Sequence, residues 1–301
     1  MMDWLYIGII AYFLNAISFV ISKIMLTDLI PDPWVYTFLV NALGILVVVL
    51  LPFSFFIPSL PVVLAALASG VTYVFALLIM YKLLFKEEAS QVVPLTGGMT
   101  PIFVFLMAFF ALGEFLNTNQ IIGFVLIVVG GFIVSHEESL KERVAHMGRK
   151  LFWGSVLSAL LFAASQVLMK FVFNNDTFMN GFLWRGFGAV LGASLLLIPA
   201  LPRKAILGSF KTSNMKTGFI FIVGQIAAVL SFILVNYAFS LGPVSLVNAL
   251  SGIQYAFLFG FIVFLSKKFP KLLKEPLKPG IVKQKVLSIV LIAIGVFALF
   301  V

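Results

Sequence analysis

Long runs of apolar residues alternate with short polar gaps along the whole of this chain. A membrane-spanning helix needs roughly 20 mostly apolar residues, because backbone groups in lipid must find their hydrogen bonds within the helix. Ten segments of this kind fit the sequence. They cover residues 4–26, 34–56, 62–83, 89–112, 118–135, 151–173, 178–199, 217–240, 244–266 and 285–301. The pattern therefore predicts an all-α integral membrane protein with ten transmembrane helices.

Turn-forming and charged residues fill the gaps between these segments, as in IPDP, IPSLP, FKEEAS and GEFLNTN. One gap is longer and more polar than the others, namely HEESLKERVAHMGRK at residues 136–150. We interpret it as a loop that connects a first domain, residues 1–135, to a second domain, residues 151–301.

The composition agrees with a protein that has the bilayer as its solvent. The chain is 62% hydrophobic and 10% charged, whereas soluble domains carry roughly 25% charged residues. Its net charge of +9 would suit nucleic acid, but the basic residues lie in short gaps between apolar runs, which is typical of cytoplasmic loops. The first apolar segment lacks a basic n-region and a cleavage site, so we interpret it as a membrane helix. We expect the lipid bilayer and a small molecule as partners, and no nucleic acid.

The positions of Lys and Arg predict how the helices are oriented. All but two of the 20 Lys and Arg lie in gaps that follow odd-numbered segments. The exceptions, Lys170 and Arg185, lie in or at the end of a segment. Cytoplasmic loops carry the excess of positive charge. We therefore expect a multi-pass protein of the plasma (inner) membrane with both termini on the non-cytoplasmic side.

The two halves of the chain share short sequence patterns in the same order. AISFVISK at residues 16–23 returns as AASQVLMK at residues 163–170, and ASQVVPLTGG at residues 89–98 returns as VSLVNALSGI at residues 244–253. Each half has five helices, an odd number, so the second half must enter the membrane with the opposite orientation. The sequence thus predicts two inverted-topology five-helix repeats (5+5), with a substrate site near the membrane midplane between them.

Four longer stretches connect this pattern to a known family. They are EASQVVPLTGGMTPIFVFLMAFFALGE, NQIIGFVLIVVGGFIV, GPVSLVNALSGIQYAFLFG and VLSIVLIAIGVFALF. Together they resemble the EamA domain of the drug/metabolite transporter (DMT) superfamily, present twice. The resemblance implies a ten-helix carrier that alternates access and moves small metabolites, often amino acids or related compounds exported from bacteria. Two features depart from the family: the predicted outside termini, and Glu114, which has no counterpart after the ninth segment.

The acidic residues and histidines do not suggest an intramembrane enzyme. All eleven Asp and Glu lie at segment ends or in loops, and both His lie within residues 136–150. Acid–base chemistry or a metal site would need paired carboxylates or His clusters inside the spans. We therefore expect no enzymatic activity, no cofactor and no metal. Proton coupling through a carboxylate would require Glu87, Glu88 or Glu114 to be drawn inward.

Arg185 lies about two turns inside the segment 178–199. A guanidinium in lipid is costly, so this side chain should face the bundle interior, a cavity or an anion. Two interpretations stay open. Arg185 is a carboxylate or phosphate clamp that uses its bidentate fork, or it reaches the outer interface or pairs with Asp176. Its repeat counterpart is Asn41, which is polar but uncharged.

Other polar and aromatic residues in the spans are further candidates for substrate binding. Some form stripes on one face of the fourth and ninth helices, and others are isolated polar groups or aromatic rings able to wall a cavity. With Arg185 and Asn41, the candidates are Asn15, Ser165, Gln166, Gln225, Asn236, Asn248, Ser251, Tyr255, Thr96, Thr100, Tyr73 and Trp184. The alternative role for each is helix packing or an interhelical hydrogen bond, and for Trp184 an interface anchor.

A cluster of prolines and glycines marks the fourth helix as a candidate gate. Two prolines enclose two glycines there, which predicts a kink or a partly unwound segment whose free backbone groups a substrate or moving neighbour would use. The lysines that end the repeated Ala-x-Ser-x-Val-x-x-Lys stripes are candidates for the same role. The candidate gating residues are Pro94, Gly97, Gly98, Pro101, Lys23 and Lys170.

The leading hypothesis is a transporter that exports a small metabolite, such as an amino acid or a related zwitterion or anion, by alternating access between two inverted repeats. One alternative is a nucleotide-sugar or lipid-linked metabolite translocator. Another, from a different class, is a non-transporting membrane scaffold or sensor, which would not need a mid-span arginine or repeated polar stripes. We expect a monomer or a homodimer.

Overall fold

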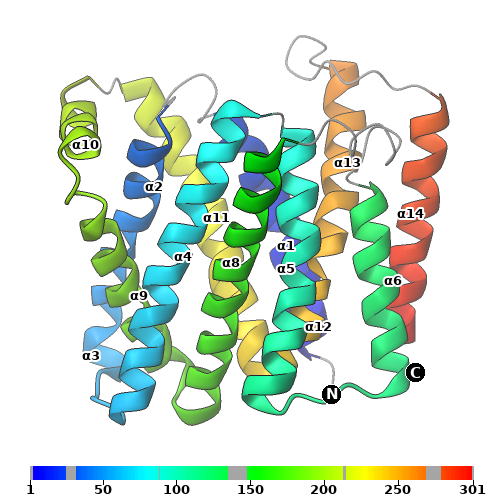
Figure 1. Ribbon diagram of the computed structural model, residues 1–301, viewed down its shortest axis with the longest axis horizontal. Helices are drawn as coiled ribbons and strands as arrows, with labels where there is room; N and C mark the ends of the chain where they lie inside the picture. Colours follow the sequence, from blue (N-terminus) through cyan, green and yellow to red (C-terminus); the bar gives the residue numbers. More distant parts are fainter. Residues whose placement is uncertain are drawn as a thin grey trace.

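The computed structural model describes residues 3–24, 32–87, 89–134, 148–212, 215–268 and 279–299. Within these ranges the regular elements are all helices, which stand side by side in an upright bundle (Figure 1). They are α1 (Asp3–Ile24), α2 (Pro33–Ala42), the 3₁₀ helix η2 (Leu43–Leu50), α3 (Leu51–Ser54), α4 (Leu60–Lys86), α5 (Ala89–Leu112), α6 (Thr118–Val134), α8 (Arg149–Asn175), α9 (Phe178–Leu195), α10 (Ala200–Thr212), α11 (Met215–Leu241), α12 (Val244–Ala249), α13 (Ser251–Lys268) and α14 (Pro279–Ala298).

The helices have the length and apolar character of membrane spans. Among the described residues, seven spans are long and apolar enough to cross a bilayer, or eight if the bent pair α9 and α10 forms one span. α6 is a shorter apolar helix. Each segment predicted from the sequence overlaps one helix or a run of consecutive helices. A multi-pass, all-helical membrane protein is therefore confirmed.

α10 was not expected, because the sequence predicts a gap between spans there. It is bent by 109° relative to α9. Its exposed basic residues, such as Arg203 and Lys204, give it a polar surface. The sequence rule for spans looks for continuous apolar runs, so it does not detect a helix of this mixed character.

The partly unwound segment expected in the fourth helix is wrong. α5 is continuous through Pro94 and Pro101. In membrane helices, neighbouring helices and Ser or Thr side chains compensate for the hydrogen bond that proline removes. Nearby, the Thr100 hydroxyl donates to the Thr96 carbonyl at 2.7 Å, whereas the carbonyl that Pro101 leaves without its helical amide donor is that of Gly97. A break lies instead in the predicted repeat counterpart, where Leu250 separates α12 from α13.

Glycines allow helices of the two halves to approach to backbone contact. A Cβ on Gly70 of α4 would overlap the Arg185 carbonyl oxygen and the Ala189 nitrogen of α9. A Cβ on Gly131 of α6 would lie 2.6 Å from the Gly252 Cα of α13. Small residues at such crossings are the usual means of close packing in membranes. The Gly70 contact fixes α9, and with it Arg185, directly against α4.

Helices of the first half pack against helices of the second. α4 packs against α8 and α9, α1 against α11, and α6 against α14. Between α4 and α8, two serines exchange hydrogen bonds: the Ser69 hydroxyl donates to the Ser165 carbonyl and the Ser165 hydroxyl to the Ser69 carbonyl, both at 2.8 Å. These contacts interlock the halves around the centre of the bundle.

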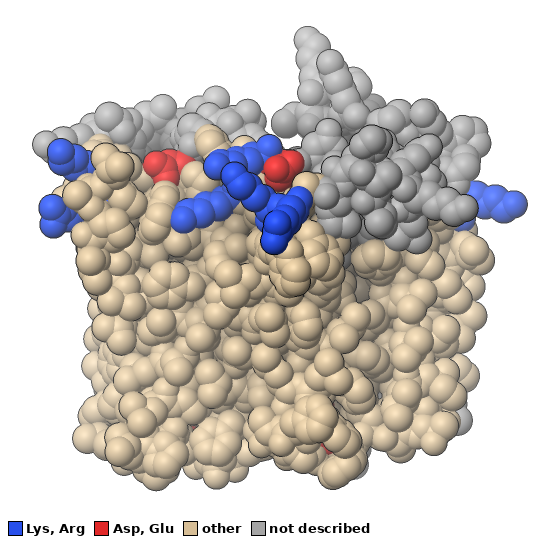
Figure 2. Space-filling model, in the orientation of Figure 1, with Lys and Arg blue, Asp and Glu red and all other residues tan. Residues whose placement is uncertain are grey.

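Basic residues gather at one end of the bundle, the upper end in Figure 2, which we call the basic end. α4 ends there with Lys82 and Lys86, and α8 begins there with Arg149 and Lys150. α1 begins and α14 ends at the opposite end (Figure 1). The basic residues drawn thus share one end of the helices, as the alternation of charged gaps predicts, and the membrane face that each end occupies stays a prediction from the positive-inside rule.

Candidate functional site

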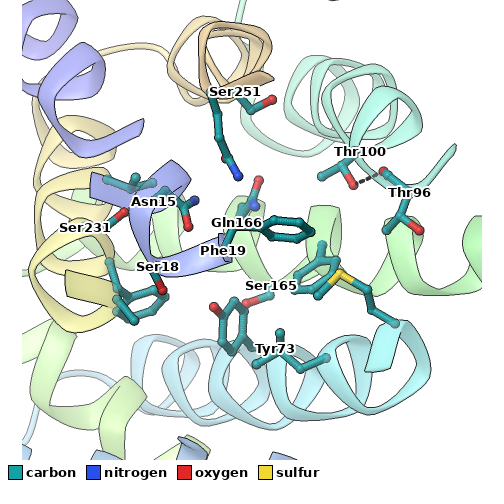
Figure 3. A pocket seen from close by; sticks show the side chains of 18 of the residues that line it. Asn15, Ser18, Phe19, Tyr73, Thr96, Thr100, Ser165, Gln166, Ser231 and Ser251 are labelled. Carbon is teal, nitrogen blue, oxygen red and sulfur yellow. Dashed lines mark hydrogen bonds between the residues drawn. The ribbon is translucent and has the colours of Figure 1, made fainter. Parts of the chain in front are cut away.

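A cavity of about 630 Å³ lies inside the bundle, lined by residues of both halves. Glu87, which is exposed at the end of α4, lines it at the basic end, together with Ser22 and Leu84. Asn236 and Phe239, close to the end of α11, line it at the other extreme. Figure 3 shows polar and aromatic side chains that converge on this space from several helices. The cavity therefore runs from the basic end deep into the bundle.

Most of the binding residues predicted from the sequence line this cavity. They come from helices of both halves of the chain and are buried or half-buried. Those that line it are Arg185, Asn15, Ser165, Gln166, Gln225, Asn236, Asn248, Ser251, Tyr255, Thr96, Thr100 and Tyr73. The fold thus brings together side chains that are distant in the sequence, and their role in binding a substrate stays a prediction.

Asn41 and Trp184 do not line the cavity. Asn41 is buried, and its side-chain amide donates to the Thr37 carbonyl one turn earlier in α2, at 2.8 Å. The Trp184 indole donates to the Phe56 carbonyl at 3.1 Å and its ring stacks on Phe55. Successive residues of an α-helix point about 100° apart, so Trp184 packs against the segment after α3 while its neighbour Arg185 faces the cavity.

The candidate gating residues lie in different surroundings. Gly97 lines the cavity, where the Tyr255 hydroxyl occupies the space that a side chain on Gly97 would need. A Cβ on Gly98 would lie 2.8 Å from the Phe132 ring. Pro101 is buried. The side chains of Pro94 and Lys23 lie outside the described part of the chain.

Lys170 and Glu114 hold the connection between α11 and α12, at the end opposite the basic end. The Lys170 ammonium donates to the carbonyls of Phe239 and Gly242, both at 2.9 Å. The Glu114 carboxylate accepts from the backbone amides of Val244 at 2.9 Å and Ser245 at 3.0 Å. A carboxylate at these amides caps the start of α12 and complements its dipole. Because Glu114 follows α5, its contact ties the first half to the second.

Arg185 is buried beside the cavity, with 5% of its surface exposed. Its guanidinium carbon lies 4.6 Å from the centre of the Tyr73 ring and 4.2 Å from that of Phe232. The two ring centres are 5.3 Å apart, so the rings form a corner that touches the guanidinium from adjacent sides. No described residue hydrogen-bonds or ion-pairs with the Arg185 side chain. Its fork is therefore available to a ligand in the cavity.

The alternative interpretations of Arg185 find no support in this geometry. The Asp176 carboxylate instead accepts from the Thr177 amide at 2.7 Å and from the Asn180 side-chain amide at 2.7 Å. A side chain with 5% exposure does not reach the outer interface. Arg185 is thus a buried cation held by aromatic rings.

Neutral polar groups line much of the remaining cavity. The Asn248 side chain donates to Gln166 across the space between α12 and α8. The side-chain oxygen Oδ1 of Asn248 and the Thr96 hydroxyl, both buried, have no hydrogen-bond partner among the described residues. Buried polar groups are normally paired, so these two mark places where a ligand or water supplies the missing bond.

Sequence reasoning did not single out several residues that line the cavity, among them Tyr12, Phe19, Ser231, Phe232 and Gln254. Phe232 carried a weak signal, since it lies seven residues after Gln225 and four before Asn236 and so shares their face of α11. A chain with 34 Phe offers no way to choose one ring by its type alone.

Comparison with known proteins supplies independent information. The sequence model of the EamA-like transporter family matches residues 2–136, which is the first of the two predicted repeats. No protein in the curated set matches the chain. One solved structure, titled "Crystal structure of protein", aligns with a TM-score of 0.67 at 13% identity and covers 98% of this chain and 96% of that chain. At this identity the likeness shows a shared fold alone.

Proposed function

We propose that the chain is a multi-pass membrane transporter, not an enzyme, and that it moves a small metabolite through the central cavity, because the model of the EamA-like transporter family matches residues 2–136. The cargo is an amino acid or a related zwitterion or anion, and the direction is export. The cavity carries this proposal, because its volume of about 630 Å³ and its polar lining from both halves fit a small-molecule site.

Ten spans arranged as two inverted repeats explain the pattern of helix contacts. In that arrangement α1, α4 and α6 correspond to α8, α11 and α14. The contact of α4 with α8 then has its equivalent in the contact of α1 with α11, and α6 packs on its own counterpart α14. A two-fold axis in the membrane plane produces such reciprocal pairs.

The difference between the two ends of the cavity supports alternating access. At the basic end, Glu87 is exposed and lines the cavity. At the opposite end, Lys170 and Glu114 hold the connection between α11 and α12. We infer a state open to the basic end, which the positive-inside rule assigns to the cytoplasm and in which cargo for export loads. Lys23, the repeat counterpart of Lys170, is proposed to act in the opposite state.

The competing functions have less support. A nucleotide sugar carries two phosphate charges, whereas Arg185 is the single cation among the described residues that line the cavity. A scaffold has no use for a buried arginine without a partner, which is costly to keep in a membrane.

Transport through the cavity can be tested with two matched substitutions on α1. Asn15 faces the cavity, whereas Ile10 is 55% exposed on the outside of the bundle. In proteoliposomes preloaded with mixed amino and organic acids, Asn15→Trp is expected to abolish counterflow and Ile10→Trp to preserve it. Exchange that survives Asn15→Trp would show that cargo does not cross this cavity, and no exchange by the unaltered protein would favour the scaffold.

A reporter fused after Val301 tests the orientation. We expect a signal from the non-cytoplasmic side, because the charged gaps place both termini there. A cytoplasmic signal would reverse the proposed direction of loading.

A further inference from the structure

We propose that Arg185 forms an anion subsite and that the cargo is a small monocarboxylate without an adjacent ammonium group, an inference that rests on the proposed transport function. It narrows the cargo from zwitterions and anions to one class. The evidence comes from the surroundings of Arg185, from the charges along the cavity and from its unpaired polar groups.

The surroundings of Arg185 leave its hydrogen-bonding edges to a ligand. Tyr73 and Phe232 touch the guanidinium from adjacent sides, while no described residue accepts a hydrogen bond from it. A buried charge without a counter-ion is unfavourable in a membrane protein. A carboxylate is planar and matches the guanidinium fork with two parallel hydrogen bonds. An anion from the cargo therefore completes this site.

The number of cations limits the charge of that anion. Among the described residues that line the cavity, Arg185 is the only Lys or Arg. Lys170 is nearby in the bundle but is bound to the carbonyls of Phe239 and Gly242. A phosphate monoester carries about −1.5 to −2 charges at neutral pH, which one guanidinium does not balance. The site therefore favours a group with a single negative charge.

The position of Glu87 argues against a zwitterion. Glu87 is the only acidic residue among the described ones that line the cavity, and it follows Tyr73 by 14 residues along α4. That spacing corresponds to about 21 Å along a helix axis, far beyond the roughly 4 Å over which an ion pair forms. The ammonium of an α-amino acid bound at Arg185 would lie close to the guanidinium without a carboxylate of the protein to balance it.

The neutral lining suggests the rest of the cargo. The side-chain oxygen Oδ1 of Asn248 and the Thr96 hydroxyl lack partners among the described residues. The Asn248 oxygen only accepts and suits a donor such as a hydroxyl, whereas the Thr96 hydroxyl can also donate to an oxo group; neither supplies a counter-charge. Phe19 and Tyr12 also line the cavity and accommodate an apolar part. Hydroxy acids with a short carbon chain match both groups, and 2-oxo acids match the Thr96 hydroxyl.

Binding to the purified protein tests the subsite with three probes that share one isobutyl side chain: 4-methyl-2-oxopentanoate, L-leucine and 3-methylbutylamine, which is leucine without its carboxylate. We expect the oxo acid to bind at least about tenfold more tightly than leucine, and the amine not to bind. Arg185→Gln should weaken oxo-acid binding about 10- to 150-fold, as expected for hydrogen bonds to a charged group. Lys204→Gln removes the same charge at an exposed position of α10 and should leave the Kd unchanged.

Three outcomes would overturn the proposal: no binding of the oxo acid, equal binding of leucine or the amine, or oxo-acid binding that survives Arg185→Gln. If that variant does not fold, 4-methylpentanamide with the unaltered protein replaces it, because the neutral amide should bind at least about tenfold more weakly than 4-methylpentanoate. Equal binding of this amide and acid would overturn the proposal too. Counterflow distinguishes failure of the subsite from failure of the proposed transport function. Leucine exchange that is unaffected by Arg185→Gln would support transport and refute the subsite. Binding that depends on Arg185, without any exchange, would support the subsite and refute transport.

Discussion

Removing the Glu114 carboxylate is expected to open the end of the cavity that faces away from the basic end. This carboxylate accepts two backbone hydrogen bonds, at 2.9 and 3.0 Å, from the first residues of α12. The Glu114 side chain is half-buried, so its contribution to stability resembles that of a helix cap that is partly exposed to water. Loss of such a cap costs about 1–2 kcal/mol. Glu114→Ala should therefore shift the equilibrium between closed and open forms about 5- to 30-fold.

Labelling of a single cysteine measures this shift. The chain has no Cys, so Val235→Cys, on the cavity wall, introduces one thiol without competitors. A membrane-impermeant maleimide added from the face opposite the basic end should react about 5- to 30-fold faster in Glu114→Ala, as long as labelling is limited by opening.

Asp32 provides the matched control, because it also caps a helix, α2, accepting from the amides of Trp34 and Val35 at 2.8 and 3.3 Å. Asp32 caps its own helix and does not join the halves. Asp32→Ala should lower the thermal unfolding midpoint without faster labelling. Unchanged labelling in Glu114→Ala, or an equal increase in Asp32→Ala, would refute the assignment of Glu114 as a tie between the halves.

Three further experiments, with four substitutions, test the packing around the site. Gly70→Ala should destabilise the protein by about 1–3 kcal/mol, seen as a lower thermal midpoint, because the new Cβ meets backbone atoms of α9; an unchanged midpoint would contradict this. Ser69→Ala and Ser165→Ala, combined in a double-mutant cycle of unfolding free energies, should show a coupling of about 0.6–1.7 kcal/mol, because the two hydroxyls also lie 3.2 Å apart, and purely additive effects would deny this direct contact. Asn41→Ala should leave the Kd for 4-methyl-2-oxopentanoate unchanged in a binding titration, since Asn41 bonds within its own helix; a tenfold loss would place it in the site after all.

The helices could be predicted because lipid constrains the sequence strongly. A backbone in a bilayer must be helical and its outer surface apolar, so continuous apolar runs mark α1, α4 and α8 within a few residues. The break at Leu250 lacks such a signal, since it contains neither proline nor glycine. Pro94 and Pro101 led to the opposite error, an unwound segment predicted where the helix is continuous. Whether neighbouring groups compensate for the hydrogen bond lost at a proline depends on the tertiary structure.

The site could be predicted in part, because a polar side chain within an apolar span requires a structural or functional reason. That reasoning found Arg185, Gln166 and Asn248, which line the cavity. It could not predict that Arg185 lines the cavity and Trp184 does not, because the sequence of a helix that is apolar on most sides does not indicate which face points inward. The aromatic corner around Arg185 depends on Phe232 of another helix, and no local pattern reveals such a neighbour.

The isolated charge of Arg185 has an electrical consequence. An empty carrier holds one positive charge near its centre, whereas a carrier loaded with a monocarboxylate is neutral there. A membrane potential acts on a charge with about 2.3 kcal/mol per 100 mV for complete passage of the field. To the extent that rocking of the halves displaces Arg185 through this field, the return of the empty carrier is voltage-dependent and the loaded step is not. An inside-negative potential would then retain the empty carrier in the inward-facing state, ready for the next anion.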